Sequence, residues 1–332
     1  VMFDIAVSEA NPDQIYAGFF DIGLWRSSDH GESWQSCNDS TFTGNWDGFG
    51  GNGIDVVADP TRADVVWATL QGDLNDPSHL IRSNQSGEKG SWVLSNSGLP
   101  QDNVISGISV DRNSPDNNRV MFVTAGGSVY KSTDDGASWT LKLANDGLRF
   151  TAIDYFDGNL IYAGGENGLR RSFDGGENWS NIGLPEMSGN QNSPLWEYGW
   201  EGVFCITTDP QNSNWIYVAA FGHGKGLWRS TNSGDSWEKM ITDDFMRCVA
   251  ISPRNSDILY ATSSSAYQAG GYYPGSGGVN FSDDGGQTWS SANDGMSWQF
   301  AIPVAIDNFP QSSVFVGSPG TGFQKALVPR PT

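Results

Sequence analysis

The chain has 332 residues and a formal net charge of −20, with 42 glycines, 12% aromatic residues and 17% charged residues. This acidity argues against a nucleic-acid partner, because phosphate binding needs a basic stripe and the sequence shows none. No run of 18 apolar residues exists, so we expect no insertion into a membrane.

Seven pairs of predicted strands follow one another along the chain, and each pair is joined by a turn rich in Pro, Asn and Asp. The pairs occupy residues 4–18, 54–69, 107–124, 152–164, 205–219, 249–262 and 304–317. Long amphipathic helical patterns are missing, so the chain is predicted to be all-β.

A Ser-x-Asp-x-Gly-x-x-Trp segment, complete or nearly so, follows five of these pairs. The copies begin at Ser27, Ser132, Ser172, Ser230 and Ser282, and a stretched copy without the Asp begins at Ser83. Successive serines are 56, 49, 40, 58 and 52 residues apart, which suits one four-stranded blade per repeat. Seven pairs and six segments predict a single seven-bladed β-propeller over residues 1–332.

The two ends of the chain carry further expectations. The last blade is predicted to begin at Pro303, to end with a strand near residues 323–327, and to be short of its outer strand. The chain starts directly in a strand without an initiator methionine. We therefore expect a processed or trimmed part of a larger protein.

Each repeated segment has a predicted local role. The Asp and Ser side chains cap backbone groups of a tight hairpin, the Gly supplies a positive φ, and the Trp buries its ring against a neighbouring strand or blade. We therefore interpret Asp29, Asp134, Asp174 and Asp284 as structural. The pattern resembles the Asp-box, or BNR repeat, of propellers that include sialidases, sortilin-type receptors, photosystem assembly factors and several glycoside hydrolases.

Three cysteines are too few for a disulfide framework. Cys205 and Cys248 each lie five residues before a proline that ends a predicted strand, so they occupy matching positions in neighbouring repeats. They are either small buried apolar side chains or a disulfide pair. Cys37 and three scattered histidines show no metal-binding spacing, so we expect no metal and no cofactor.

Alternating strand direction divides the predicted loops between two faces of the propeller. With the strands of a blade lettered A to D from the channel outward, the repeated segments are C–D turns. The B–C loops and the connections between blades lie on the opposite face, and long loops on a rigid scaffold usually carry function. The predicted ligand-binding side chains of that face are Trp46, Phe49, Trp196, Tyr198, Trp200, His223, Tyr272, Tyr273 and Trp298.

Aromatic rings beside carboxylates suit a polysaccharide or glycan partner. The rings stack on the apolar C–H faces of sugars, and carboxylates accept hydroxyl protons or catalyse cleavage of a glycosidic bond. The alternative is that these rings fill gaps between blades, as Trp and Tyr in propeller loops often do.

The first 80 residues resemble glycoside hydrolase family 74, the xyloglucanase-type enzymes. The matching features are Tyr16-Ala17, Asp21-Ile22-Gly23, Trp25-Arg26, Trp46-Asp47, Gly53-Ile54-Asp55 and Asp59-Pro60-Thr61. The resemblance implies that Asp21 takes the position of a catalytic carboxylate. Leu24 replaces the second Gly of the family's Asp-Ile-Gly-Gly, and the family has two tandem propellers with one catalytic Asp on each.

A hydrolase of this inverting type needs a second carboxylate about 6.5–9.5 Å from Asp21. Asp47 is the first candidate, Asp73, Glu197 and Glu201 are the others, and a second propeller domain is the remaining source. The sequence thus predicts an extracellular or cell-surface glycoside hydrolase acting on β-glucan or xyloglucan-type polysaccharide. The alternative is a non-catalytic propeller that binds a protein or glycan in adhesion or assembly.

Overall fold

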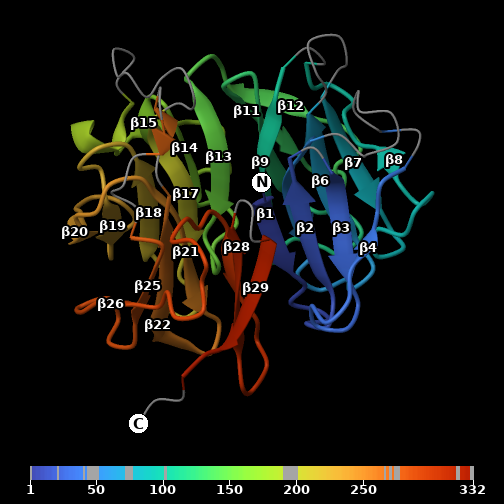
Figure 1. The fold of residues 1–332 in the computed structure, drawn as a ribbon. Coiled ribbons are helices and arrows are strands. Elements are labelled where there is room, and N and C mark those ends of the chain that lie inside the picture. Colours follow the sequence, from blue (N-terminus) through green and yellow to red (C-terminus); the bar gives the residue numbers. More distant parts are fainter. Residues whose placement is uncertain are drawn as a thin grey trace.

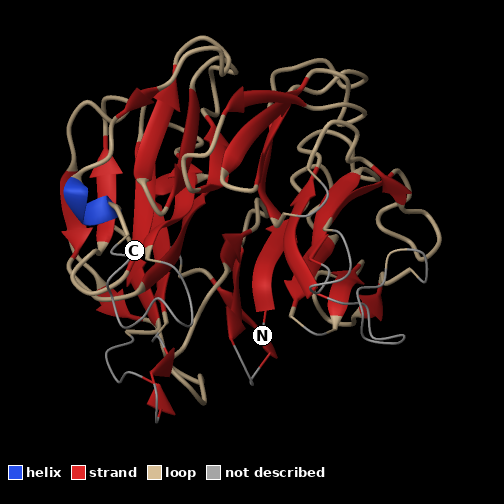
Figure 2. Cartoon of the chain, turned by 90° about the horizontal axis from the view of Figure 1, so that it is seen from above, coloured by secondary structure: helices blue, strands red, loops and turns tan. Residues whose placement is uncertain are grey.

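Antiparallel strands account for almost all regular structure in the chain. The computed structural model describes residues 2–20, 22–39, 42, 52–71, 78–100, 103–189, 201–264, 267–268, 271–272, 277–318 and 322–329. These residues form seven sheets arranged as the blades of a propeller, and a two-stranded hairpin (Figure 1). Their only helical element is the 3-10 turn η1 (Pro185–Met187; Figure 2). The predicted seven-bladed, all-β propeller is confirmed.

The blades follow the chain in order. Blade 1 contains β1 (Met2–Val7), β2 (Ile15–Phe19), β3 (Gly23–Ser27) and β4 (Gln35–Ser36). Blade 2 contains β5 (Asn52–Ala58), β6 (Val66–Gln71), β7 (His79–Ser83) and β8 (Val93–Leu94). Blade 3 contains β9 (Ile105–Val110), β10 (Met121–Ala125), β11 (Ser128–Ser132) and β12 (Thr140–Leu143). Blade 4 contains β13 (Leu148–Ile153), β14 (Ile161–Gly165), β15 (Gly168–Ser172) and β16 (Ser180–Asn181).

The last three blades complete the ring. Blade 5 contains β17 (Gly202–Thr208), β18 (Ile216–Phe221), β19 (Leu227–Ser230) and β20 (Glu238–Ile241). Blade 6 contains β21 (Met246–Ser252), β22 (Asn255–Ser263), β25 (Val279–Ser282) and β26 (Ser290–Ser291), with the hairpin β23 (Tyr267–Gln268) and β24 (Gly271–Tyr272) between its second and third strands. Blade 7 contains β27 (Val304–Ile306), β28 (Ser313–Ser318) and β29 (Gly322–Leu327).

The second strand of each blade is covered on both sides by neighbouring blades. Every residue of β10 and of β18 is buried, which explains why these strands are apolar runs rather than alternating patterns. Each inner strand contacts the inner strand of the next blade, and β27 contacts β1. The inner strands therefore run side by side around the axis of the propeller and begin on the same face.

The repeated Ser-x-Asp segments close the turn between the third and fourth strands. In blade 1, Ser27 Oγ donates to Asp29 Oδ1 at 2.7 Å, and the same carboxylate oxygen accepts the Ser33 amide at 2.8 Å. The hydroxyl of Ser27 also accepts the amide of Gly31 at 2.8 Å, where φ is +84°. The corresponding bonds recur at Asp134, Asp174, Asn232 and Asp284. The predicted capping role is confirmed.

Several segment tryptophans tie one blade to the preceding one. The indole of Trp92 donates to the carbonyl of Cys37 at 3.0 Å, and that of Trp139 donates to the carbonyl of Ser95 at 2.6 Å. Both indole rings are buried. Each therefore buries apolar surface while its N–H group keeps a hydrogen-bond partner. The hairpin thus contributes to packing between blades as well as to its own turn.

Side chains join the first and last blades, which share no strand among the described residues. His30 Nε2 lies 2.7 Å from Asp307 Oδ2, and the ring centroids of Trp34 and Phe323 are 4.7 Å apart. Figure 1 shows β1 and β28 beside each other, in agreement with their contact. Blade 7 has three strands in this region, as the sequence predicts.

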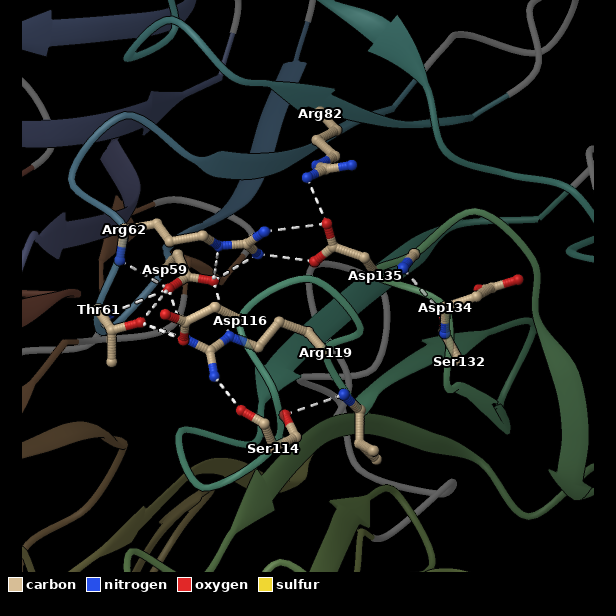
Figure 3. Close-up of polar contacts among 12 residues, drawn as sticks. Asp59, Thr61, Arg62, Arg82, Ser114, Asp116, Arg119, Ser132, Asp134 and Asp135 are labelled. Atoms are coloured by element: carbon tan, nitrogen blue, oxygen red, sulfur yellow. Dashed lines mark hydrogen bonds and ion pairs between the residues drawn. The ribbon is translucent and has the colours of Figure 1, made fainter.

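A buried ion network joins blades 2 and 3 on the hairpin face (Figure 3). The fully buried Asp59 accepts from Arg119 Nη2 at 3.0 Å and from Arg62 Nη2 at 2.6 Å. Arg62 also bonds Asp135, which in turn pairs with Arg82. Asp59 belongs to the Asp-Pro-Thr segment named in the family resemblance, and its role here is to hold two blades together.

Candidate functional site

The face on which inner strands begin and second strands end is called the loop face below. Of the predicted site residues, Glu201, His223 and Trp298 are described. Tyr272 lies in β24, and nothing is described of its side chain. The others lie outside the described residues: Asp21, Asp47, Asp73, Glu197, Trp46, Phe49, Trp196, Tyr198, Trp200 and Tyr273.

The residues that flank position 21 form an exposed apolar rim. Phe20 is 38% exposed and Ile22 is 40% exposed, and the ring of Phe20 lies 5.6 Å from that of Phe3. The Ile22 carbonyl accepts from Trp25 Nε1 at 3.0 Å and from Asn38 Nδ2 at 2.8 Å. The backbone after position 21 is therefore anchored from two sides, next to apolar surface that a sugar ring can cover.

Glu201 is buried and faces a lysine. Its Oε2 lies 3.7 Å from Lys225 Nζ, and both side chains are nearly inaccessible. Gly222 (φ +133°) makes room for this pair, because a Cβ there would lie 2.5 Å from Lys225 Cε. Burial lowers the pKa of Lys225, and the carboxylate of Glu201 opposes that shift. The pair is arranged for structural support of the loop face.

Lys225 also holds the other end of the segment that Glu201 closes. Its Nζ donates to the carbonyls of Ser188 and Glu186, just before the predicted aromatic segment 190–200. Gly189 donates its amide to the carbonyl of Glu166 at 2.6 Å. One ammonium group thus connects both ends of that segment.

An imidazole oriented by a carboxylate lies on the neighbouring loop. His223 Nδ1 is 2.9 Å from Asp244 Oδ2, and the imidazole is 44% exposed. The imidazole packs edge-on against the ring of Phe245, with the two ring centroids 4.8 Å apart. The backbone of Phe245 has a positive φ of 59°. A histidine held in this way can exchange protons or bind a hydroxyl group.

Four phenylalanine rings, called the aromatic collar below, connect blades 4, 5 and 6 near the start of their inner strands. Successive ring centroids are 5.6, 5.3 and 5.2 Å apart along the series Phe150, Phe204, Phe221 and Phe245. The guanidinium carbon of Arg247 lies 4.3 Å from the Phe204 ring centre and 3.9 Å from that of Phe221.

Trp298 is 37% exposed and packs at 5.1 Å against Phe300 in the connection between blades 6 and 7. Among the residues whose side chains are described, Trp298 is the one tryptophan, tyrosine or phenylalanine of the predicted ligand-binding side chains, and its ring is partly exposed to solvent.

Two carboxyl groups meet on the inner strands of blades 1 and 2. Asp4 Oδ2 accepts the amide of Val56 at 2.8 Å, and Asp55 Oδ2 accepts the amide of Ile108 at 2.7 Å. Burial raises the pKa of Asp4, and burial together with the charge of Asp4 raises the pKa of Asp55 well above its usual range. The pair therefore favours a protonated carboxyl group at Asp55 beside Asp4.

The two inner-strand cysteines of blades 5 and 6 also meet. Cys205 pairs with Ala219 and Cys248 with Thr262 at matching points of their strands, so the predicted equivalence is confirmed. Both thiols are free and half-buried, and their Sγ atoms lie 2.8 Å apart. Within the described part of the chain, no three His, Cys, Asp or Glu side chains are arranged to hold a metal.

Sequence reasoning missed Arg247 and the Asp4–Asp55 pair as features of the inner strands. Asp4 and Asp55 stand at the same place in the first two strand pairs, so an alignment of the repeats with one another contains a signal for them. Arg247 has no such signal, because its aromatic neighbours come from another blade.

A search of the described residues for membrane-spanning helices finds no helix of sufficient length and hydropathy.

Sequence comparison finds similarity to xyloglucanases. No family profile matches the chain. It is 27% identical over 255 residues to a xyloglucanase of Paenibacillus sp, covering 70% of the chain and 20% of that relative. It is also 27% identical over 150 residues to xyloglucanase Xgh74A of Acetivibrio thermocellus, covering 40% and 15%. The chain spans about a fifth or less of the length of these relatives.

Structure comparison finds the same fold in an enzyme and in a peptide-binding protein. The GH74 enzyme of Niastella koreensis matches 98% of this chain and 52% of its own at 20% identity, with a TM-score of 0.71. YCF48 bound to D1 peptide matches 99% of this chain and 93% of its own at 14% identity, with a TM-score of 0.65. The chain resembles the GH74 xyloglucanases. These structural matches establish the shared fold alone, and the predicted resemblance is confirmed.

Proposed function

We propose that this chain is one propeller of an extracellular glycoside hydrolase that acts on xyloglucan or a related β-glucan. The observation that carries the proposal is the sequence similarity to the Paenibacillus xyloglucanase, which extends over 70% of the chain. The exposed apolar rim at Phe20 and Ile22, directly beside position 21, supports it. A polysaccharide substrate is met outside the cell, which is the basis for the proposed location.

In this proposal Asp21 is one catalytic carboxylate and Asp47 is the first candidate for the second. Asp73 and Glu197 are the remaining candidates within the chain, and a second propeller is the other source. The ion pair with Lys225 favours a positioning role for Glu201 over acid–base catalysis. An inverting reaction uses one carboxyl group as acid and the other as base toward a water molecule.

The test is release of reducing sugar from xyloglucan and from mixed-linkage glucan. Asp21→Asn is expected to lower the rate by at least about 100-fold, as loss of a general acid or base does. Asp13→Asn is the matched control, because Asp13 is exposed on the A–B turn of the same blade and should leave the rate unchanged. Wild-type release at background level on both polymers rejects catalysis by this chain. Equal rates above background for wild type and Asp21→Asn reject the catalytic role of Asp21.

A second candidate function is binding without catalysis. It is favoured by the propeller neighbour YCF48, whose structure is bound to a D1 peptide, and by β29, whose outer edge has no strand partner among the described residues. Such an edge can add a strand from another chain. Retention of wild-type protein by xyloglucan in an affinity gel, without sugar release, supports a glycan-binding module. Absence of both retention and release favours a protein partner.

A further inference from the structure

Arg247 is a half-buried cation without a carboxylate partner in the described part of the structure. Nine other arginines of these residues form ion pairs with Asp or Glu: Arg26, Arg62, Arg82, Arg112, Arg119, Arg149, Arg170, Arg171 and Arg229. In a chain with a net charge of −20, an unpaired guanidinium packed against two phenylalanine rings requires an explanation.

The orientation of the guanidinium leaves its terminal nitrogens available. Arg247 Nε donates to Ser264 Oγ, while Phe204 and Phe221 lie against the guanidinium. The two Nη groups have no hydrogen-bond partner among the described residues. They form the planar fork that binds both oxygens of a carboxylate.

The surroundings strengthen attraction for an anion. The rings of Phe204 and Phe221 cover one side of the Arg247 guanidinium, and charges interact more strongly where water is displaced. Burial lowers the pKa of Arg247 to about 9, so the group remains charged at neutral pH although it has lost hydration. A bound carboxylate would compensate that loss.

The geometry points to a carboxylate-binding subsite at Arg247, suited to a uronic acid residue of an acidic polysaccharide. This inference rests on the proposed carbohydrate function and extends it to charged sugars. Phe150 and Phe204, the partly exposed members of the collar, present apolar rings for the C–H face of the sugar. The His223–Asp244 pair lies next to Phe245 of the collar. This pair offers polar atoms for the hydroxyl groups of the sugar.

The test compares two oligosaccharides that differ only in charge. Isothermal titration calorimetry measures wild-type binding of a glucuronic-acid-containing oligosaccharide and of its carboxyl-reduced counterpart. We expect at least tenfold tighter binding of the acidic form, weakening as salt is raised. Arg247→Met should abolish this preference. Equal affinity for the two sugars, or a preference that survives in Arg247→Met, overturns the proposal.

Two further variants separate charge, fork geometry and folding. Arg247→Lys keeps a cation but not the fork, so we expect most of the preference to be lost, and full retention overturns the proposal even if Arg247→Met does not fold. Arg254→Met is the matched control, because Arg254 is exposed on an A–B turn of the same blade and should change nothing. A peptide with a free C-terminal carboxylate that binds more tightly than the acidic sugar also overturns the assignment.

The outcomes distinguish this subsite from the proposed hydrolase. Selective binding of the acidic sugar without cleavage of xyloglucan supports the subsite and rejects the enzyme. Cleavage of neutral xyloglucan without any preference for the carboxylate rejects the subsite and leaves the enzyme.

Discussion

At the scale of single residues, the buried carboxylate of Asp59 is paired with two cations. Asp59 is fully buried and accepts hydrogen bonds from two arginines. Burial alone would raise its pKa, but the bonds from Arg119 and Arg62 outweigh burial and hold the pKa of Asp59 well below its usual range. The carboxylate is therefore a source of stability at neutral pH, and its loss leaves two cations without their shared partner.

We predict that Asp59→Asn lowers the free energy of unfolding by about 3 kcal/mol at neutral pH. Because the folded pKa of Asp59 is depressed, its stabilisation is present above the unfolded value of 3.8 and is lost as pH falls through the folded pKa. The gap between wild type and variant in urea titrations should thus be constant above about pH 5 and shrink at lower pH.

Asp64→Asn is the control for this prediction, since Asp64 is exposed on the same turn and should change stability by less than about 0.5 kcal/mol. A gap between Asp59→Asn and wild type that stays the same down to pH 2 would contradict the proposed charge pairing.

At the scale of elements, Lys225 connects three parts of the chain that are distant in sequence. It lies on the loop between β18 and β19, yet it binds carbonyls beside η1 and faces Glu201 at the start of β17. The backbone also fixes these ends, through the Gly189 amide and the pairing of Gly202 with Phe221, but Lys225 is the side chain that connects one end with the other.

We predict that Lys225→Met increases amide hydrogen exchange at Gly189 and Gly202, and lowers stability by about 3 kcal/mol because Glu201 is left buried without its cation. Hydrogen exchange followed by mass spectrometry, together with thermal unfolding, measures both effects. The double variant Glu201→Gln/Lys225→Met should recover part of the lost stability, since it removes the unpaired charge.

Lys239→Met is the matched comparison. Lys239 donates to the carbonyl of Gly224 on the same loop and has no hydrogen bond or ion pair with the described residues between η1 and β17. Exchange at Gly189 that rises equally in both variants would show that Lys225 has no specific positioning role.

At the scale of the whole molecule, the ring is closed by side-chain packing between blades 1 and 7. Each blade is built from one continuous stretch of chain, so no strand is shared across the junction within the described residues. The contacts of Phe323 with Trp34 and of His30 with Asp307 take the place of backbone pairing. The junction is therefore expected to be the first part of the ring to open.

We predict that Phe323→Ala lowers the free energy of unfolding by about 2 kcal/mol, less than a fully buried phenylalanine costs because this ring is half-buried. Hydrogen exchange should rise first in β27, β28 and β29. Phe173→Ala, at a ring that is 57% exposed, should have little effect. Uniform exchange across all seven blades in Phe323→Ala would contradict closure at this junction.

Sequence reasoning is accurate where structure repeats locally. The Ser-x-Asp segments predict their own hairpins, because every bond of Asp29 is made within a few residues. The same holds for the seven strand pairs and for the short last blade. The function of the Asp-Pro-Thr segment was not predictable in this way, since Asp59 acquires its role from Arg119, 60 residues away.

The amino-acid sequence by itself determined the propeller, its number of blades and its hairpins, because these depend on periodic spacing and short-range hydrogen bonds. The likeness to xyloglucanases came from motifs in the first 80 residues. Only the tertiary structure decided that Asp55 lies beside Asp4, that Lys225 reaches Glu201, and that Arg247 lies against two rings of blade 5. These contacts between side chains depend on strand register and on how one blade packs against the next. Neither is encoded within any single repeat.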